Sequence, residues 1–132
     1  MGMEKLTVEY ELATRTPSII WGMISTDAGL QKWMADDVHE SGDTMTFTWG
    51  DTWRQHDTRT AKIVKREKNS RIRMTWDYID DEDAYLEMRI EKSEITGGLH
   101  LIITDYAEPD DTENLRNLWN DNLARLHNAS GL

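Results

Sequence analysis

Residues 16–36, with the sequence TPSIIWGMISTDAGLQKWMAD, limit the possible folds of this chain more than any other segment. The segment begins with Thr16 and Pro17, the pattern of a helix N-cap followed by proline at the first helical position, where the missing N–H costs nothing. Thr26 or Asp27 can cap a second helix. Apolar side chains recur at helical spacing after each start: Ile20, Met23 and Ile24, and then Leu30, Trp33 and Met34. The segment therefore predicts two short helices in succession.

Apolar and polar residues alternate with a period of two on both sides of these helices, which predicts strands with one buried face. Glycine-containing turns are expected at residues 41–43, 50–51 and 96–98. The predicted strands are residues 5–12, 36–40, 44–49, 52–65, 71–76, 86–91 and 99–103. Short turns between successive strands favour an antiparallel sheet built from consecutive hairpins.

The hydrophobic period changes near the end of the chain, where leucine and tryptophan recur at helical spacing. Asp111 or Thr112, after Pro109, can cap this helix. Its predicted buried stripe consists of Leu115, Leu118, Trp119, Leu123 and Leu126. A sheet with one apolar face needs an element that covers it, and this long helix is the best candidate. The order of elements predicts an α+β helix-grip fold in one domain over residues 1–132.

The composition argues against several classes of partner. Fifteen Lys and Arg residues against 25 Asp and Glu residues give a net charge of −10, which opposes phosphate backbones and anionic lipid surfaces. The chain has no cysteine, which excludes disulfides and thiolate chemistry and fits a reducing compartment. It has no apolar run near the ~18 residues of a membrane span. We therefore expect a cytoplasmic protein with no nucleic-acid partner and no stable membrane insertion.

Large apolar side chains are unusually frequent, with six tryptophans and seven methionines. The tryptophans are spread over nearly every predicted element, so most elements contribute a large side chain to a common interior. Methionine adapts to irregular shapes within such an interior. Two interpretations remain open: these side chains fill a solid core, or some of them line a cavity for an apolar ligand.

Residues that carry catalytic or metal chemistry form no recognisable motif. The sequence has no GxSxG, P-loop or dinucleotide fingerprint, and its four histidines show no metal-binding spacing. The acidic residues between Asp77 and Asp83 lack the alternating ligands and central glycine of an EF-hand loop, so a solvated hairpin tip is favoured over a Ca²⁺ site. The acidic residues from Glu108 to Glu113 suit a helix N-terminus. We expect no metal, no cofactor and no enzymatic activity.

Several segments resemble the START-like branch of the SRPBCC superfamily, in particular its small START-like proteins of the Bacteroidetes type. These segments are YELATRTPSIIW, ISTDAGLQKWMADDV, FTWGD, IRMTWDYIDDEDAYLEMRI, LIITDYAE and LRNLWNDNLARL, and together they span nearly the full length. The GLxxW element also resembles activators of the large heat-shock chaperone ATPase. The resemblance implies a curved antiparallel sheet wrapped around the C-terminal helix, with a cavity between them. It does not imply one function, because the superfamily includes lipid carriers, hormone receptors, cyclases and co-chaperones.

Two classes of function are consistent with these observations. The first is non-enzymatic binding of a hydrophobic or amphipathic small molecule, such as a lipid, in that cavity. The second is a protein-interaction or co-chaperone-like module that acts through its acidic surface on a protein partner. For the first class, the inward faces of the strands and helices predict these ligand-binding residues: Trp33, Trp49, Met74, Trp76, Leu86, Met88, Ile103, Leu115 and Trp119.

Overall fold

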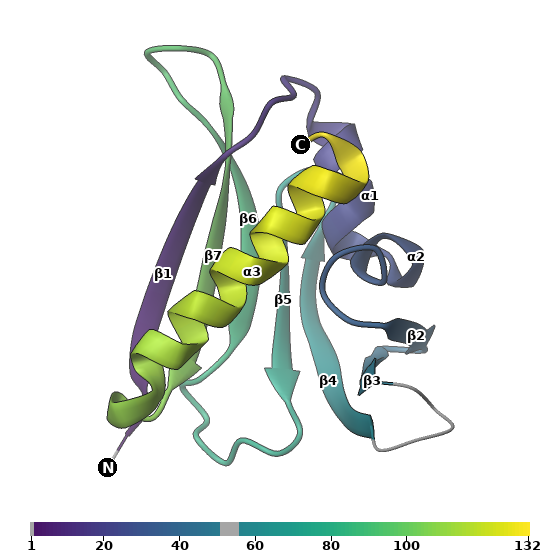
Figure 1. Cartoon of the computed structure of the whole chain (residues 1–132), viewed down its shortest axis with the longest axis vertical. Helices are drawn as coiled ribbons and strands as arrows, with labels where there is room; N and C mark the ends of the chain where they lie inside the picture. The colour runs from purple at the N-terminus through teal and green to yellow at the C-terminus, as the bar shows by residue number, and fades with distance from the viewer. Residues whose placement is uncertain (1, 51–55) are drawn as a thin grey trace.

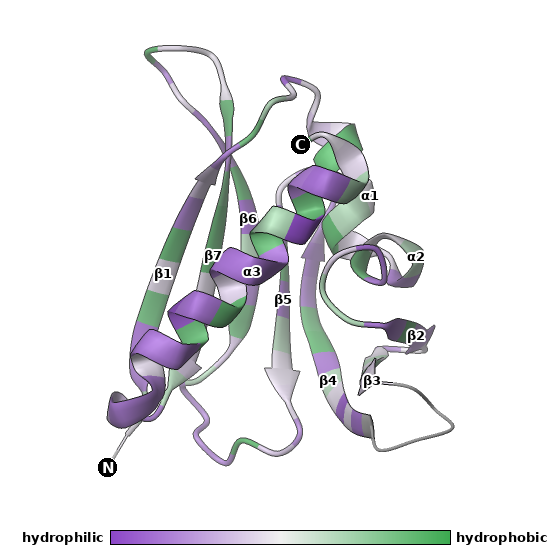
Figure 2. Cartoon of the chain, in the orientation of Figure 1, coloured by the Kyte–Doolittle hydropathy of each residue, from purple (hydrophilic) through white to green (hydrophobic). Residues whose placement is uncertain are grey.

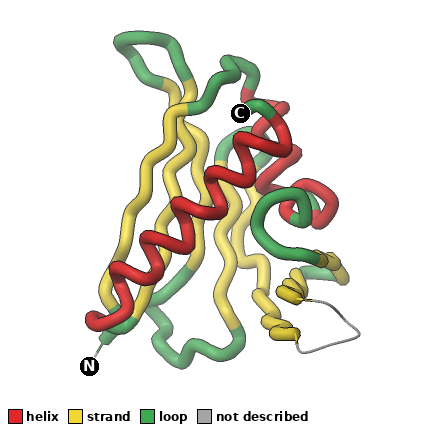
Figure 3. Tube along the Cα trace, in the orientation of Figure 1, coloured by secondary structure: helices red, strands yellow, loops and turns green. Residues whose placement is uncertain are grey.

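The computed structural model describes residues 2–50 and 56–132 (Figure 1). In this part of the chain, seven strands form one antiparallel sheet, and the long helix α3 crosses one face of it (Figures 1 and 3). The elements in chain order are β1 (Glu4–Glu11), α1 (Pro17–Ser25), α2 (Asp27–Leu30), β2 (Asp37–Ser41), β3 (Thr44–Gly50), β4 (His56–Glu67), β5 (Arg71–Trp76), β6 (Leu86–Lys92), β7 (Leu99–Ala107), a 3₁₀ turn (Pro109–Asp111) and α3 (Thr112–Ser130).

The strands are arranged in the sheet in the order β1-β7-β6-β5-β4-β3-β2. Strands β2 to β7 are consecutive hairpins, whereas β1 pairs with β7, so that Leu6 lies opposite Asp105. This leaves β1 and β2 at the two edges of the sheet, and β2 matches the short edge strand predicted for residues 36–40. The alternation of apolar and polar residues along the strands is visible in Figure 2. The predicted α+β helix-grip fold is confirmed.

The helix α3 buries one stripe of its surface against the sheet. Trp119, Leu123 and Leu126 are buried, as predicted, but the prediction for Leu118 is wrong, because its side chain is 48% exposed. One residue step rotates an α-helix by roughly 100°, so Leu118 lies at the border of the face that Trp119 occupies. Asn122 is buried on that face instead. Its side-chain carbonyl accepts a hydrogen bond from Arg125, which offsets the cost of burying the amide.

The two short helices begin where the sequence predicts. Thr16 is the N-cap position of α1, and Thr26 caps α2 by accepting a hydrogen bond from Gly29 N at 3.0 Å. The second helix is shorter than its apolar spacing suggests: α2 ends at Leu30, and Trp33 and Met34 lie in the turns beyond it. Both side chains are nevertheless buried, so the apolar pattern identified their burial and overestimated the length of the helix.

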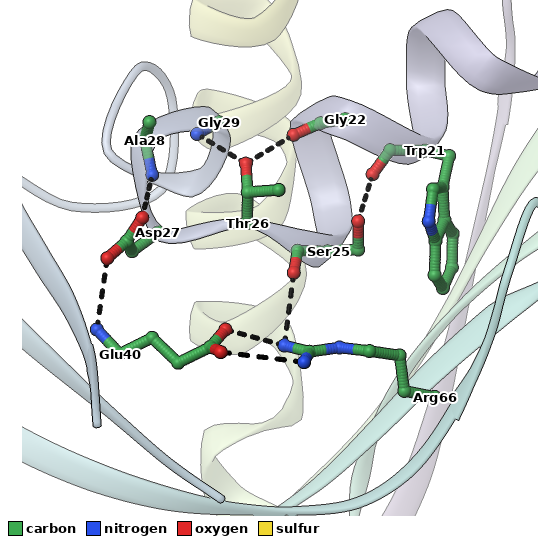
Figure 4. A network of polar contacts seen from close by, with 9 residues as sticks. All are labelled: Trp21, Gly22, Ser25, Thr26, Asp27, Ala28, Gly29, Glu40 and Arg66. Carbon is green, nitrogen blue, oxygen red and sulfur yellow. Dashed lines mark hydrogen bonds and ion pairs between the residues drawn. The ribbon is translucent and has the colours of Figure 1, made fainter. Parts of the chain in front are cut away.

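A network of polar contacts fastens these helices to the sheet (Figure 4). The Arg66 guanidinium on β4 donates to the backbone oxygen of Ser25 at 3.1 Å and pairs with Glu40 on β2 at 2.6 Å. One carboxylate oxygen of Asp27 accepts from the backbone N–H of Glu40 at 3.2 Å. These contacts join the end of α1, the start of α2 and two strands. The segment after α2 has its own bonds to the sheet, because the side-chain oxygen of Gln31 accepts from the backbone N–H of Val38 at 3.1 Å.

The connection between β3 and β4 lies outside the described residues. The last pair of their ladder joins Gly50 to His56. The tight turn predicted at residues 50–51 therefore falls at the limit of the described residues, and Trp53 falls outside them.

Candidate functional site

A hollow of about 240 Å³ lies between the first half of α3 and the inner face of the sheet. Met34, after α2, closes part of its wall, and the remaining lining comes from β3, β4, β5, β7 and the loop after β5. We call it the grip cavity. It is lined by Met34, Trp49, Asp57, Arg59, Trp76, Tyr78, Asp105, Leu115, Leu118, Trp119 and Asn122.

The apolar wall of the grip cavity is held in place by ring contacts and by an indole hydrogen bond. Trp49 donates its ring N–H to the backbone oxygen of Met34 at 2.9 Å. The centre of the Trp76 ring lies 5.7 Å from that of Tyr78 and 5.2 Å from that of Phe47, which is fully buried. Aromatic rings with such partners have little freedom to turn. The wall is therefore a preformed apolar surface.

Asp105 is the polar group at the inner side of the grip cavity. Only 7% of its surface is exposed, because it lies on the face of β7 that α3 covers. Trp119 donates its ring N–H to Oδ2 at 2.9 Å, and the backbone N–H of Tyr106 donates to Oδ1 at 2.8 Å. Burial raises the pKa of this carboxyl to about 6, although the two hydrogen bonds act in the opposite direction.

The outer rim of the cavity carries an ion pair. The Arg59 guanidinium lies 3.0 Å from Asp57 Oδ2 and donates to the Tyr78 hydroxyl at 3.0 Å. It also lies over the Tyr78 ring, 4.7 Å from its centre. About half of each side chain in the Arg59–Asp57 pair remains exposed, so the pair is solvated. The rim is therefore polar, while the wall behind it is apolar.

The structure separates the nine predicted ligand-binding residues into two groups. Trp49, Trp76, Leu115 and Trp119 come together around the grip cavity. The other five are packed in the core, with at most 1% of their surface exposed: Trp33, Met74, Leu86, Met88 and Ile103. Some of the predicted residues thus fill a solid core, and others border a hollow.

Sequence reasoning missed Asp105 as a site residue, although its position carried a signal. Leu99, Leu101 and Ile103 alternate inward, and the next inward position of the same strand is Asp105. An acidic residue in an apolar inward series needs a partner or a function. Alternation along the strand at residues 52–65 likewise puts Arg59 on the same face as Ala61, but its position at the cavity rim depends on the path of α3.

Three larger hollows in the described residues have a different character. One of about 420 Å³ is lined by the polar network of Figure 4, whose groups already bond to one another. Another, of about 700 Å³, lies by the acidic loop after β5 and the start of the chain. The third, of about 340 Å³, is lined mainly by polar side chains, among them Asp57, Arg59 and Asp77. Within the residues that the structure describes, no three His, Asp or Glu side chains are placed to hold a metal ion. The grip cavity is therefore the best candidate for a ligand site.

Comparison with known proteins agrees with this geometry. A START-like superfamily domain matches residues 1–132. A protein called BfR322 from Bacteroides fragilis has 37% identity over 97% of this chain and 91% of its own, with a TM-score of 0.63. Two others share the fold at low identity. The Aha1 dimer from Colwellia psychrerythraea has 18% identity over 97% of this chain and 96% of its own, and a TM-score of 0.74. Protein MLL2253 from Mesorhizobium loti has 14% identity over 96% of each chain, and a TM-score of 0.74.

A search of curated proteins gave no match. Among the helices in the described ranges, none has the length and apolar character needed to cross a membrane. The match over residues 1–132 and the relative from Bacteroides fragilis are sufficient to assign the family. The chain belongs to the START-like superfamily.

Proposed function

We propose that this protein binds a small apolar or amphipathic molecule in the grip cavity without transforming it. The observation that carries the proposal is the preformed wall of Trp49, Trp76 and Trp119, which borders a hollow beneath α3. Apolar pockets with a few convergent polar groups are typical ligand sites. The START-like fold, which commonly encloses hydrophobic ligands, supports the same function.

The size of the cavity favours a small ligand. Ligand pockets commonly measure about 300–1,000 Å³, and the grip cavity, at about 240 Å³, lies just below that range. A molecule with one ring and a short chain is of the right size, whereas a lipid with two acyl chains requires a much larger space. We therefore narrow the lipid-like ligand expected from the sequence to a compact amphiphile.

The chemistry of the lining favours binding over catalysis. Among the described residues that surround the grip cavity, none is a serine, cysteine, histidine or lysine, the side chains that most often act as nucleophile or base. Asp57 and Arg59 are paired with each other at the rim. Asp105 remains as the one buried carboxyl in the lining, and it holds the ring N–H of Trp119.

Calorimetric titration with butylbenzene tests this function directly. We expect saturable binding to the unmodified protein and at least tenfold weaker binding to Leu115→Phe, whose larger ring occupies part of the cavity. Ile19→Phe makes the same kind of change at a position that is 53% exposed on α1, so it should leave the affinity unchanged.

Native mass spectrometry of freshly purified protein should show an apolar adduct. If neither butylbenzene nor an amphipathic analogue such as 4-phenylbutanol or 4-phenylbutylamine gives saturable heat, and no adduct is found, the grip cavity is not a binding site.

A protein-interaction module is the second candidate function. The net charge of −10 supports it, because an acidic surface attracts basic partners and repels acidic ones. A repeated absence of adducts and of butylbenzene binding would favour this candidate.

A further inference from the structure

We propose that the ligand of the grip cavity carries an ammonium group, which pairs with the buried carboxylate of Asp105 and lies against the tryptophan rings. This inference rests on the proposed function, since it names the class of molecule that the same cavity takes. Three features of the lining support it: the unused acceptor capacity of Asp105, the balance of charge, and the aromatic wall.

Asp105 has more acceptor capacity than its described neighbours use. An ionised carboxylate offers about four lone-pair sites. Within the described residues, Asp105 accepts one hydrogen bond on each oxygen, from Trp119 and from the backbone of Tyr106. The side chain lines the cavity while only 7% of its surface is exposed. A ligand that donates a hydrogen bond therefore meets a poorly hydrated acceptor that is already held in place.

Among the described residues, the charges around Asp105 leave its own charge unbalanced. From β4, Arg59 faces the cavity with its charge taken by Asp57, at 3.0 Å. Tyr78, in the loop after β5, is neutral at ordinary pH, because burial raises its pKa further. From α3, Trp119 and Asn122 are uncharged, and β1 places Leu6 opposite Asp105. The described lining therefore carries a net charge of −1 from Asp57, Arg59 and Asp105 when Asp105 is ionised, and a cationic ligand would neutralise it.

The aromatic wall favours the same sign of charge. The face of an indole ring attracts a cation, and the attraction is strongest where water is excluded. Three of the residues that line the cavity are tryptophans, and a tyrosine stands at its rim. A carboxylate ligand, such as the head of a fatty acid, would instead face both Asp105 and the negative faces of these rings. The lining thus discriminates against anionic amphiphiles.

The proposed pairing also makes binding dependent on pH. Burial holds the pKa of Asp105 near 6 in the absence of ligand, so much of the carboxyl is protonated at pH 5.5, and nearly all of it is ionised at pH 8. An alkyl ammonium stays charged over this whole interval. A cationic ligand should therefore bind more tightly as the pH rises through 6, and an anionic ligand more weakly.

A matched series of phenylbutyl compounds tests the inference: 4-phenylbutylamine, 4-phenylbutanol, 4-phenylbutyrate and butylbenzene. Calorimetry at pH 8 should rank the amine about tenfold or more above butylbenzene and the alcohol, with the butyrate weakest. Lowering the pH to 5.5 should weaken amine binding roughly threefold to fourfold, in proportion to the ionised fraction of Asp105, and leave butylbenzene unchanged.

Two variants test whether Asp105 is the residue that causes the preference for the amine. Asp105→Asn removes the charge but keeps an acceptor for Trp119, and it should bring the amine to within roughly twofold of butylbenzene and abolish the pH dependence. Asp121→Asn removes one charge from the exposed side of α3 and should leave the amine preference intact.

The outcomes separate the two proposals. If none of the four compounds binds, the proposed function fails, and the inference fails with it. If butylbenzene binds but the amine has no advantage, or if the advantage survives in Asp105→Asn, the cavity is a ligand site and the inference about the ammonium group is wrong. If the butyrate binds most tightly, Arg59 rather than Asp105 selects the ligand, and the inference is again overturned.

Discussion

The ring N–H of Trp119 donates to the carboxylate of Asp105 at 2.9 Å, across the contact between α3 and β7. Both partners are buried, and both line the grip cavity. The bond therefore serves two purposes. It fixes the rotation of the helix against the sheet, and it holds the buried carboxylate of Asp105 in a defined orientation.

Replacing Asp105 by Asn should change how stability depends on pH. The carboxyl has an ordinary pKa near 3.8 in the unfolded chain and about 6 in the folded protein, so the folded state binds the proton more tightly. Folded stability is therefore lost as the pH rises from about 4 to 6, by about 3 kcal/mol in total. Asp105→Asn has no titrating carboxyl at this position, so its stability should not fall in this pH range.

Urea unfolding of both proteins at pH 4 and pH 8 measures the difference. We expect the free energy of unfolding of Asp105→Asn to gain roughly 2.4 kcal/mol relative to the unmodified protein between these two pH values, because part of the total is already lost at pH 4. Parallel pH profiles for the two proteins would show that Asp105 is hydrated and not buried as described.

Replacing Trp119 by Ala should destabilise the fold strongly. Its side chain is 2% exposed and packs 6.2 Å, centre to centre, from the ring of Trp33. Removing a buried aromatic ring costs about 3–5 kcal/mol, measured as the free energy of unfolding in urea. Leu118→Ala is the matched control on the same helix and should cost less than about 1 kcal/mol, because Leu118 is half exposed. A loss below about 1 kcal/mol for Trp119→Ala would mean that α3 does not grip the sheet.

Two glycines of the helical segment should respond in opposite ways to the same substitution. A Cβ on Gly29 would lie 2.0 Å from the backbone oxygen of Gly22 and 2.7 Å from Cα of Met23, and backbone atoms cannot move aside cheaply. Gly29→Ala should therefore cost at least about 2 kcal/mol. Gly22→Ala meets nothing within 4 Å and lies inside α1, so it should stabilise the protein by about 0.5–1 kcal/mol. Thermal unfolding of the two variants gives the comparison, and equal shifts in Tm would refute the close packing of α1 and α2.

The acidic loop after β5 should not bind calcium tightly. The Asp81 carboxylate is engaged by the backbone N–H groups of Met3 and Asp83, at 3.3 and 2.9 Å, and so already has donors. Calorimetric titration with Ca²⁺ and Mg²⁺ should show no saturable binding tighter than roughly 10 μM, within the range of calcium sensors. Tighter binding would reveal a metal site in this loop.

The fold could be predicted because its two periodicities are explicit in the sequence. The alternation through Met45 and Phe47 and the stripe through Trp119, Leu123 and Leu126 each bury the side chains that the pattern selects. Leu118 and Asn122 are the exceptions. Hydrophobicity alone ranks Leu118 as buried, whereas the hydrogen bond from Arg125 to Asn122 allows the amide to take the inner position.

The cavity was less predictable than the fold. Alternation identifies which side chains point inward, but it does not show where a space remains between α3 and the sheet. Met74 and Trp76 share a face of β5, yet Met74 is fully buried in the core and Trp76 lines the cavity. That distinction depends on the path of α3 across the strands, which is set by contacts between residues far apart in the sequence.

Methyl-detected NMR during a titration with butylbenzene would show whether the grip cavity is the binding site, because it locates the ligand by residue. We expect saturable shifts for the methyl groups of Met34, Leu115 and Leu118, which line the grip cavity, and none for the exposed Ile19 and Ile95. Shifts that are absent, that do not saturate, or that centre on Ile19 and Ile95 would contradict a ligand site beneath α3.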